Sequence, residues 1–107
     1  MEFTEIKAQI RNLSPDSIRV DDDCYLEAVF NKESIGRVEK ALEEILGKPL
    51  RPSQDKIPGD IQKLIDGFGG LRKGQTLFFS NKDGVSLFAM LWPWQDGENT
   101  TIKLGRV

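Results

Sequence analysis

The part of this 107-residue chain that decides its fold is residues 81–92, with the sequence NKDGVSLFAMLW. The Asp83-Gly84 step is a strong signal for a tight hairpin turn, because glycine adopts positive φ without steric cost. Residues 85–92 are then apolar at odd and even positions alike, so a strand here must be covered on both faces. We therefore expect residues 85–92 to form the central and most buried strand of an antiparallel sheet.

Two further strands are expected beside this one. Residues about 75–80 precede the Asp-Gly turn and would form the first arm of its hairpin. After 85–92, Pro93 breaks the ladder and Asp96-Gly97 supplies a second turn, so residues 100–106 can return as a third strand. The C-terminal third of the chain therefore predicts an antiparallel β-meander.

A fourth strand is expected near residues 24–30, ahead of the helical part of the chain. The side chains of Cys24, Leu26, Ala28 and Phe30 would share one face of it. Ile18-Arg19-Val20 is typical of a short extended piece, and three aspartates at 21–23 make a turn between the two segments.

Two helices are expected between that strand and the meander. Residues 34–46 place apolar side chains at helical spacing, and Asn31 or Ser34 can cap this helix. Residues 58–68 begin with a proline, which suits a first helical turn, and end in glycines. With both helices packed on one side of the sheet, the fold class is α+β.

The N-terminal residues 3–13 are compatible with a helix or a strand. Phe3, Ile6, Ile10 and Leu13 recur at helical spacing. Ile6, Ala8 and Ile10 also alternate with polar residues, as they would in a strand. The helical pattern is slightly the better of the two.

Composition limits the chemistry this chain can perform. A chain of this length is expected to form one globular domain over residues 1–107. It has no histidine and a single cysteine, Cys24, so histidine-based nucleophile activation, a histidine-ligated zinc and a four-cysteine cluster are excluded. No catalytic motif is visible, and we expect neither a metal nor a cofactor.

The expected environment is the cytoplasm. The N-terminal residues show no secretory signal, and no apolar run is long enough for a membrane helix. One cysteine suits a reducing compartment. The net charge of -2 argues against a nucleic acid as the main partner, because such binding needs a basic excess. We therefore expect a protein partner, most simply a second copy in a homodimer.

Residues 67–74, GFGGLRKG, form the first candidate site. Backbone N–H groups of Gly69, Gly70 and Gly74 could surround an anion, with Arg72 as a fork and Lys73 as a point charge. The alternative is a glycine-rich helix end that leads into the meander, since glycine is the usual residue at such corners. The segment lacks the Gly-Lys-Ser/Thr ending of a P-loop.

The second candidate site is Trp92-Pro93-Trp94. Strand alternation sends one tryptophan into the core, and Pro93 ends the strand so that the other ring can lie at the surface. Exposed tryptophan is enriched at binding hot spots. The alternative is a core plug with an aromatic lid.

Together these features favour a small cytoplasmic protein-interaction module that is not an enzyme. We expect it to self-associate or to dock on a partner through a sheet face or edge and the Trp92–Trp94 region. The alternative function is an anion- or phosphoryl-ligand-binding domain that uses the 67–74 loop.

Overall fold

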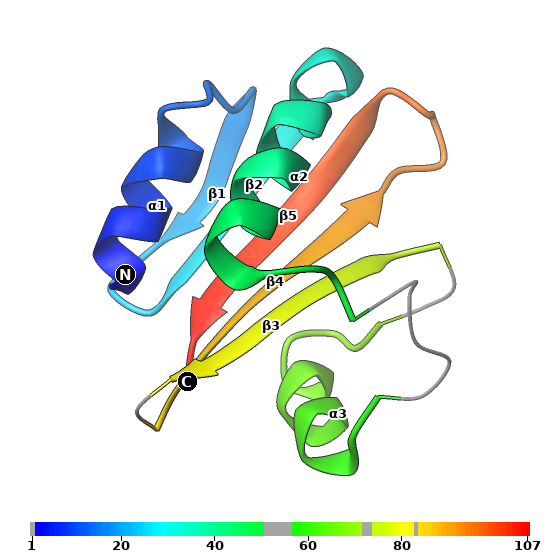
Figure 1. The fold of residues 1–107 in the computed structure, drawn as a ribbon. Coiled ribbons are helices and arrows are strands. Elements are labelled where there is room, and N and C mark those ends of the chain that lie inside the picture. Colours follow the sequence, from blue (N-terminus) through cyan, green and yellow to red (C-terminus); the bar gives the residue numbers. More distant parts are fainter. Residues whose placement is uncertain (1, 51–56, 72–73, 83) are drawn as a thin grey trace.

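The computed structural model describes residues 2–50, 57–71, 74–82 and 84–107, and within them it has three helices and five strands. In chain order these are α1 (Phe3–Arg11), β1 (Ser17–Asp21), β2 (Tyr25–Asn31), α2 (Lys32–Leu46), α3 (Gly59–Asp66), β3 (Thr76–Lys82), β4 (Val85–Pro93) and β5 (Asn99–Arg106). The strands form one antiparallel sheet in the order β1-β2-β5-β4-β3 (Figure 1). The predicted α+β class, the meander and the strand near 24–30 are confirmed, with bounds that differ from the expected ones by at most two residues.

The N-terminal segment is a helix, as the spacing of its apolar residues slightly favoured. Phe3, Ile6 and Ile10 of α1 are all buried, and they lie on the single face that this spacing creates. The helix ends at Arg11, ahead of Ser14, whose φ of 61° lies in the left-handed region. That turn brings the chain back into β1.

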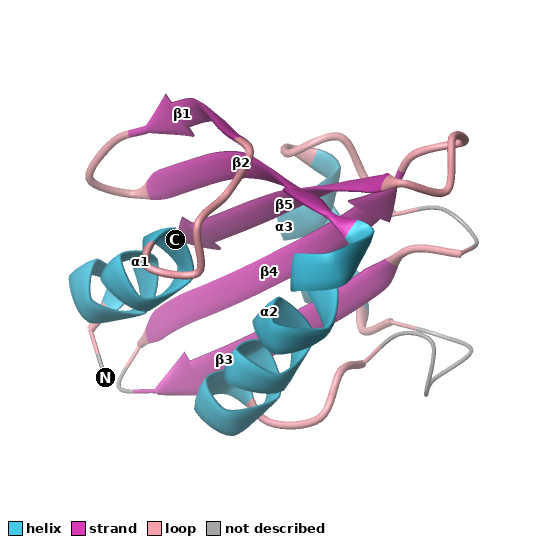
Figure 2. Cartoon of the chain, turned by 90° about the horizontal axis from the view of Figure 1, so that it is seen from above, coloured by secondary structure: helices cyan, strands magenta, loops and turns pink. Residues whose placement is uncertain are grey.

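The helices cover both faces of the sheet, whereas we expected 34–46 and 58–68 on the same side. α1 and α2 pack on one face, and α3 lies across the other (Figure 2). We call these the α1/α2 face and the α3 face. The expectation was wrong because the spacing of apolar residues shows that a helix has a buried side but not which face of the sheet it meets.

The main core lies between the sheet and the α1/α2 face. Val38 and Leu42 of α2, both fully buried, meet alternate residues of β2 such as Leu26 and Phe30. Asn31 provides the cap of α2, because its side-chain oxygen accepts hydrogen bonds from the backbone N–H groups of Glu33 and Ser34, each at 3.0 Å. Cys24, expected on the same face as Leu26, instead precedes β2 and is exposed.

β4 is apolar on both sides because helices cover both sides. Ala89 and Leu91 face α1 and α2, while Phe88 and Met90 join Ile65 of α3 in a second core. The middle position of the sheet belongs to β5, so the expectation that 85–92 is the central strand was wrong. Burial on two faces requires a covering layer on each side and places no demand on strand order.

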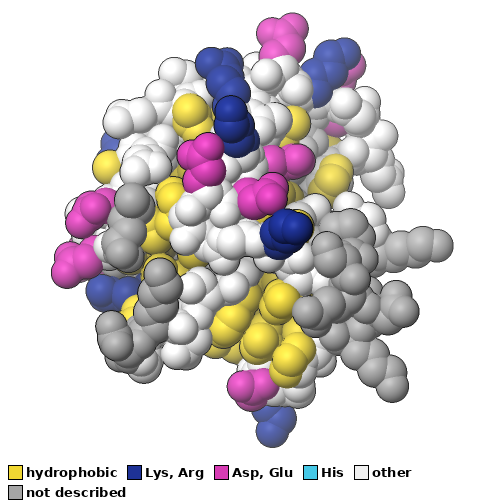
Figure 3. Space-filling view, in the orientation of Figure 1, with side chains coloured by type: hydrophobic (Ala, Val, Ile, Leu, Met, Phe, Trp, Pro, Cys, Tyr) yellow, Lys and Arg dark blue, Asp and Glu magenta, His cyan; other side chains and the backbone are white. Residues whose placement is uncertain are grey.

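The side of the molecule seen in Figure 3 mixes lysine and arginine with aspartate and glutamate. Among the described residues on this side, charges of both signs are interspersed, which is typical of an ordinary solvated protein surface. In the described parts of the chain, no helix is both long and apolar enough to cross a lipid bilayer.

Two glycine-to-alanine substitutions should change the free energy of unfolding in opposite directions. A Cβ atom at Gly105 would lie 2.5 Å from carbon atoms of the Phe88 ring, so Gly105→Ala should lower the free energy of unfolding by about 2 kcal/mol through overpacking. Gly36 sits inside α2, where an added methyl group would meet open space, so Gly36→Ala should raise the free energy of unfolding by about 1 kcal/mol. Urea denaturation of both variants measures this. Equal effects from the two would contradict the packing described for β4 and β5.

Candidate functional site

The glycines of the 67–74 loop end α3. The backbone N–H of Gly69 donates to the carbonyl of Asp66 at 3.3 Å, and that of Gly70 donates to Ile65 at 3.0 Å. Both glycines have positive φ, 104° and 74°, as helix-ending residues commonly do. These bonds leave the two N–H groups occupied, so they do not support an anion cradle. Arg72 and Lys73 lie outside the described residues, and Gly74 is exposed with a φ of 88°.

The same loop lies directly on Trp92. A Cβ atom at Gly69 would come within 2.6 Å of the tip of the indole ring, so only glycine permits this approach. Beside Gly69, the Lys103 ammonium sits 3.4 Å from the ring centre and donates to the carbonyl of Phe68 at 2.9 Å. Burial lowers the pKa of Lys103, and the nearby carboxylate of Glu27 partly opposes this shift. Trp92 is therefore a covered residue that holds the loop in place.

The Phe68 side chain packs the loop against the sheet. Its ring stacks on Tyr25 of β2, with centroids 5.4 Å apart, and packs on Phe88 of β4 at 4.7 Å. The Tyr25 hydroxyl donates to Glu27 at 2.7 Å. Partial burial, with this bond to a carboxylate, raises the pKa of Tyr25.

The close approach of Gly69 to Trp92 predicts the cost of a methyl group in this loop. Gly74→Ala meets open space and should cost only about 1 kcal/mol for its positive φ. Gly69→Ala carries the same backbone cost plus the collision with the indole, so it should cost about 2 kcal/mol more. Thermal denaturation followed by tryptophan fluorescence compares the two. If the two variants lose the same stability, the loop does not pack on Trp92 as described.

Trp94 and Pro93 both lie at the surface, and the Trp94 ring lies on the α3 face of the sheet. Trp94 is 38% exposed, and its indole N–H donates to the Thr101 hydroxyl at 2.8 Å. Pro93 is the last residue of β4 and is exposed. The guanidinium of Arg19, from β1, lies 5.5 Å from the centre of the Trp94 ring. The two tryptophans thus have different surroundings: Trp92 lies under the loop, and Trp94 is exposed.

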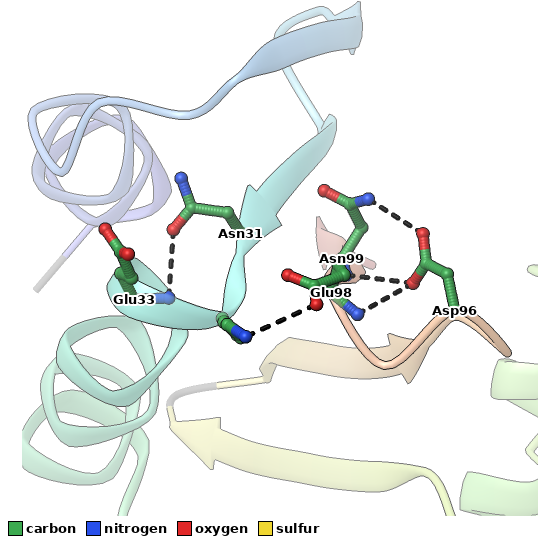
Figure 4. Close-up of polar contacts among 6 residues, drawn as sticks. Asn31, Glu33, Asp96, Glu98 and Asn99 are labelled. Atoms are coloured by element: carbon green, nitrogen blue, oxygen red, sulfur yellow. Dashed lines mark hydrogen bonds and ion pairs between the residues drawn. The ribbon is translucent and has the colours of Figure 1, made fainter.

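A polar turn holds Trp94 in position. The carboxylate of Asp96 accepts hydrogen bonds from the backbone N–H groups of Glu98 and Asn99, at 2.8 and 3.1 Å, and from the Asn99 side chain at 2.9 Å (Figure 4). These bonds lower the pKa of Asp96. The carbonyl of Glu98 then accepts from the Lys32 N–H at 2.8 Å, which ties the turn to the start of α2.

β1 is an exposed edge strand that the sequence alone does not single out as a site. All five of its residues are exposed, including Ile18 at 42% and Val20 at 37%. Ile18 pairs with Ala28 and so lies on the α1/α2 face, whereas Val20 pairs with Glu27 and lies on the α3 face. The register shifts between Ile18 and Val20, which is an irregularity typical of edge strands.

The two edges of the sheet differ in how they are covered. At the β3 edge, the backbone N–H of Leu50 donates to the carbonyl of Leu77 at 2.8 Å, so Leu50 pairs with this strand at one point. At the other edge, β2 flanks β1 on one side, and no strand in the described part of the chain flanks it on the other. An open hollow beside β1 is lined by Ala8, Arg11, Asn12 and Ile18.

α1 holds β1 in place through one carboxylate. The side chain of Asp21 binds the Lys7 ammonium at 2.9 Å and the Arg11 guanidinium at 3.1 Å. The hydrogen bond from Lys7 and the two positive charges lower the pKa of Asp21. Both cations of α1 near this edge are therefore already paired with a carboxylate.

This ion pair predicts how stability depends on pH. Because the pKa of Asp21 is lower in the folded state, its charged form stabilises the fold, and this contribution is lost as pH falls below about 4. Asp21→Asn should therefore be less stable than wild type at neutral pH, and the difference should disappear in strong acid. Urea denaturation across this range is the measurement. Glu39→Gln, an exposed position on α2, is the matched control, and a difference that persists in acid would contradict the assignment.

Among the described residues, no group of three or more Asp, Glu or Cys side chains is placed to hold a metal ion, and the chain has no histidine. In the described parts of the chain, the carboxyl groups with clearly shifted pKa values are Asp21 and Asp96, and both shift downward, opposite to the direction expected of a general acid. The exposed Cys24 thiol lies 3.4 Å from the Arg106 guanidinium.

Comparisons with protein-family models, with curated proteins and with solved structures found no match to this chain.

Proposed function

We propose that this protein is a non-catalytic interaction module that binds another polypeptide strand along β1, beside the Trp94 ring. One observation carries the proposal: β1 is an edge strand with an exposed aliphatic side chain on each face of the sheet. An edge strand presents unpaired backbone N–H and C=O groups, which an incoming strand can satisfy, and side chains on both faces then select its sequence.

Features of β1 favour a specific partner over indiscriminate pairing. The strand is short, it carries Arg19 and Asp21, and its register shifts after Ile18. Natural proteins use these three devices to keep edges from aggregating. A partner must therefore match the charges and the shape of this edge in addition to its backbone.

A homodimer is less favoured once the fold is known. A symmetric dimer would bury an apolar sheet face that the chain itself leaves uncovered, and α3 with residues 67–71 already covers the apolar face of β4. A second copy is still one candidate partner, antiparallel to β1 across a twofold axis. As part of the same proposal we place the protein in the cytoplasm, because its lone cysteine is free and suits a reducing compartment.

The alternative, an anion-binding loop, receives less support. The N–H groups of Gly69 and Gly70 are used by the end of α3. Arg72 and Lys73, the two candidate cations of this loop, lie outside the described residues, so the interaction module is the function that the described geometry supports better.

The test is selection of random-sequence peptides displayed on phage against the wild-type protein. Selected peptides should bind wild type and lose at least about tenfold in affinity for Ile18→Lys and Val20→Lys, since both changes put a charge on the proposed edge. Both positions are exposed, so the variants should fold, which circular dichroism checks. Val85→Lys is the matched control, because Val85 is 41% exposed but lies on β4.

Sedimentation equilibrium on the same four proteins tests the second copy as partner. Self-association that Val20→Lys removes and Val85→Lys keeps would identify that partner. The proposal is contradicted if the wild type is monomeric and selection returns no peptide whose binding depends on β1.

A further inference from the structure

We propose that the strand bound by β1 belongs to a different protein and alternates apolar with acidic residues, its apolar side chains on the α1 side and its carboxylates beside Arg19. This inference rests on the proposed function and adds the chemistry of the partner. It follows from the different surroundings of the two sides of β1, since a strand laid along an edge also alternates its side chains between the two faces.

The α3 side of the edge offers a positioned cation. Arg19 lies over the Trp94 ring, which is itself held by the hydrogen bond from its indole to Thr101. A guanidinium held over an aromatic face keeps its N–H groups free to bind a carboxylate. Within the described residues, Arg19 forms no ion pair, whereas Lys7, Arg11 and Lys32 each do. A carboxylate of the partner strand could form an ion pair with Arg19.

The α1 side of the edge offers an apolar contact instead. The hollow beside β1 is bordered by Ile18 and by Ala8 of α1. Arg11 also lines it, but its charge is already bound to Asp21 at 3.1 Å. Lys7 and Arg11 are both paired with Asp21, so neither cation is free to bind an acidic residue of the partner on this face. An aliphatic side chain would cover the exposed part of Ile18, which favours burial of apolar surface here.

The charges also separate this partner from a second copy. A twofold axis at the middle of β1 would bring two Arg19 side chains together, and like charges opposite one another destabilise strand pairing. The one carboxylate within β1 is Asp21, and it is held by Lys7 and Arg11 on the α1/α2 face. A second copy thus has no free carboxylate in β1 for Arg19.

The test uses three capped peptides with a common apolar pattern, TVELEVT, TVKLKVT and TVQLQVT, and measures binding to the whole chain by isothermal titration calorimetry. The glutamate peptide should bind wild type at least about tenfold more tightly than the lysine peptide, with the glutamine peptide between them. In Arg19→Glu this order should reverse. Arg37→Glu, an exposed position on α2 with the same change in charge, should keep the wild-type order.

Three outcomes would overturn the inference. These are equal binding of the glutamate and lysine peptides, a preference for glutamate that survives in Arg19→Glu, or a homodimer whose dissociation by Val20→Lys shows that a second copy occupies the edge. In each case peptides recovered by selection that still depend on Ile18 and Val20 would leave the proposed function standing. Failure of both experiments would remove the function and the partner together.

Discussion

The contact between Gly69 and Trp92 is the constraint on which the arrangement of the α3 side depends. A glycine with positive φ lets the backbone lie on the indole, and the Lys103 ammonium lies over the same ring beside Gly69. Phe68 then fills the space between Tyr25 and Phe88. Through these contacts α3 covers β3 and β4, which lie at one side of the sheet. α3 does not cover the opposite edge of the sheet, which is formed by β1.

Polar contacts hold the open edge and the turn beside it in place. Asp21 joins β1 to α1 through two cations, and the Asp96 turn joins the end of β4 to the start of α2. Arg19 and Trp94 therefore face solvent from backbone segments anchored on the core. Such support lowers the entropy that binding would otherwise cost, since the contact residues already have a defined place.

Local signals in the sequence predicted most of the helices and strands. The order of the strands and the face covered by each helix could not be predicted, because they depend on contacts between distant segments. The Asp-Gly turn, the spacing of Phe3, Ile6 and Ile10, and the capping residue Asn31 each act over a few residues, so the hairpin and the helices could be inferred. Residues 85–92 showed that both faces are covered but could not show that α3 covers one of them. The order of the strands depends on pairings between distant segments, such as β2 with β5.

The candidate site was only partly accessible to the same reasoning. Trp94 stood out because Pro93 ends a strand beside it, which allowed an exposed ring but left a covered one as the alternative; the structure has Trp94 38% exposed. β1 did not stand out, because five residues with arginine at the centre and aspartate at the end give no clear alternation. The extended Ile18-Arg19-Val20 segment was the one available signal, and its position at the edge of the sheet needed the fold.

Residue-resolved amide hydrogen exchange tests the central claim, that β1 is an open edge which accepts a strand. In the free protein the amides of β2 and β5 should be protected, while outward-facing amides of β1 should exchange fast. Saturation with a peptide whose binding depends on Ile18 and Val20 should protect those β1 amides and few others. Slow exchange along β1 in the free protein, or protection that appears elsewhere when peptide is added, would contradict the account.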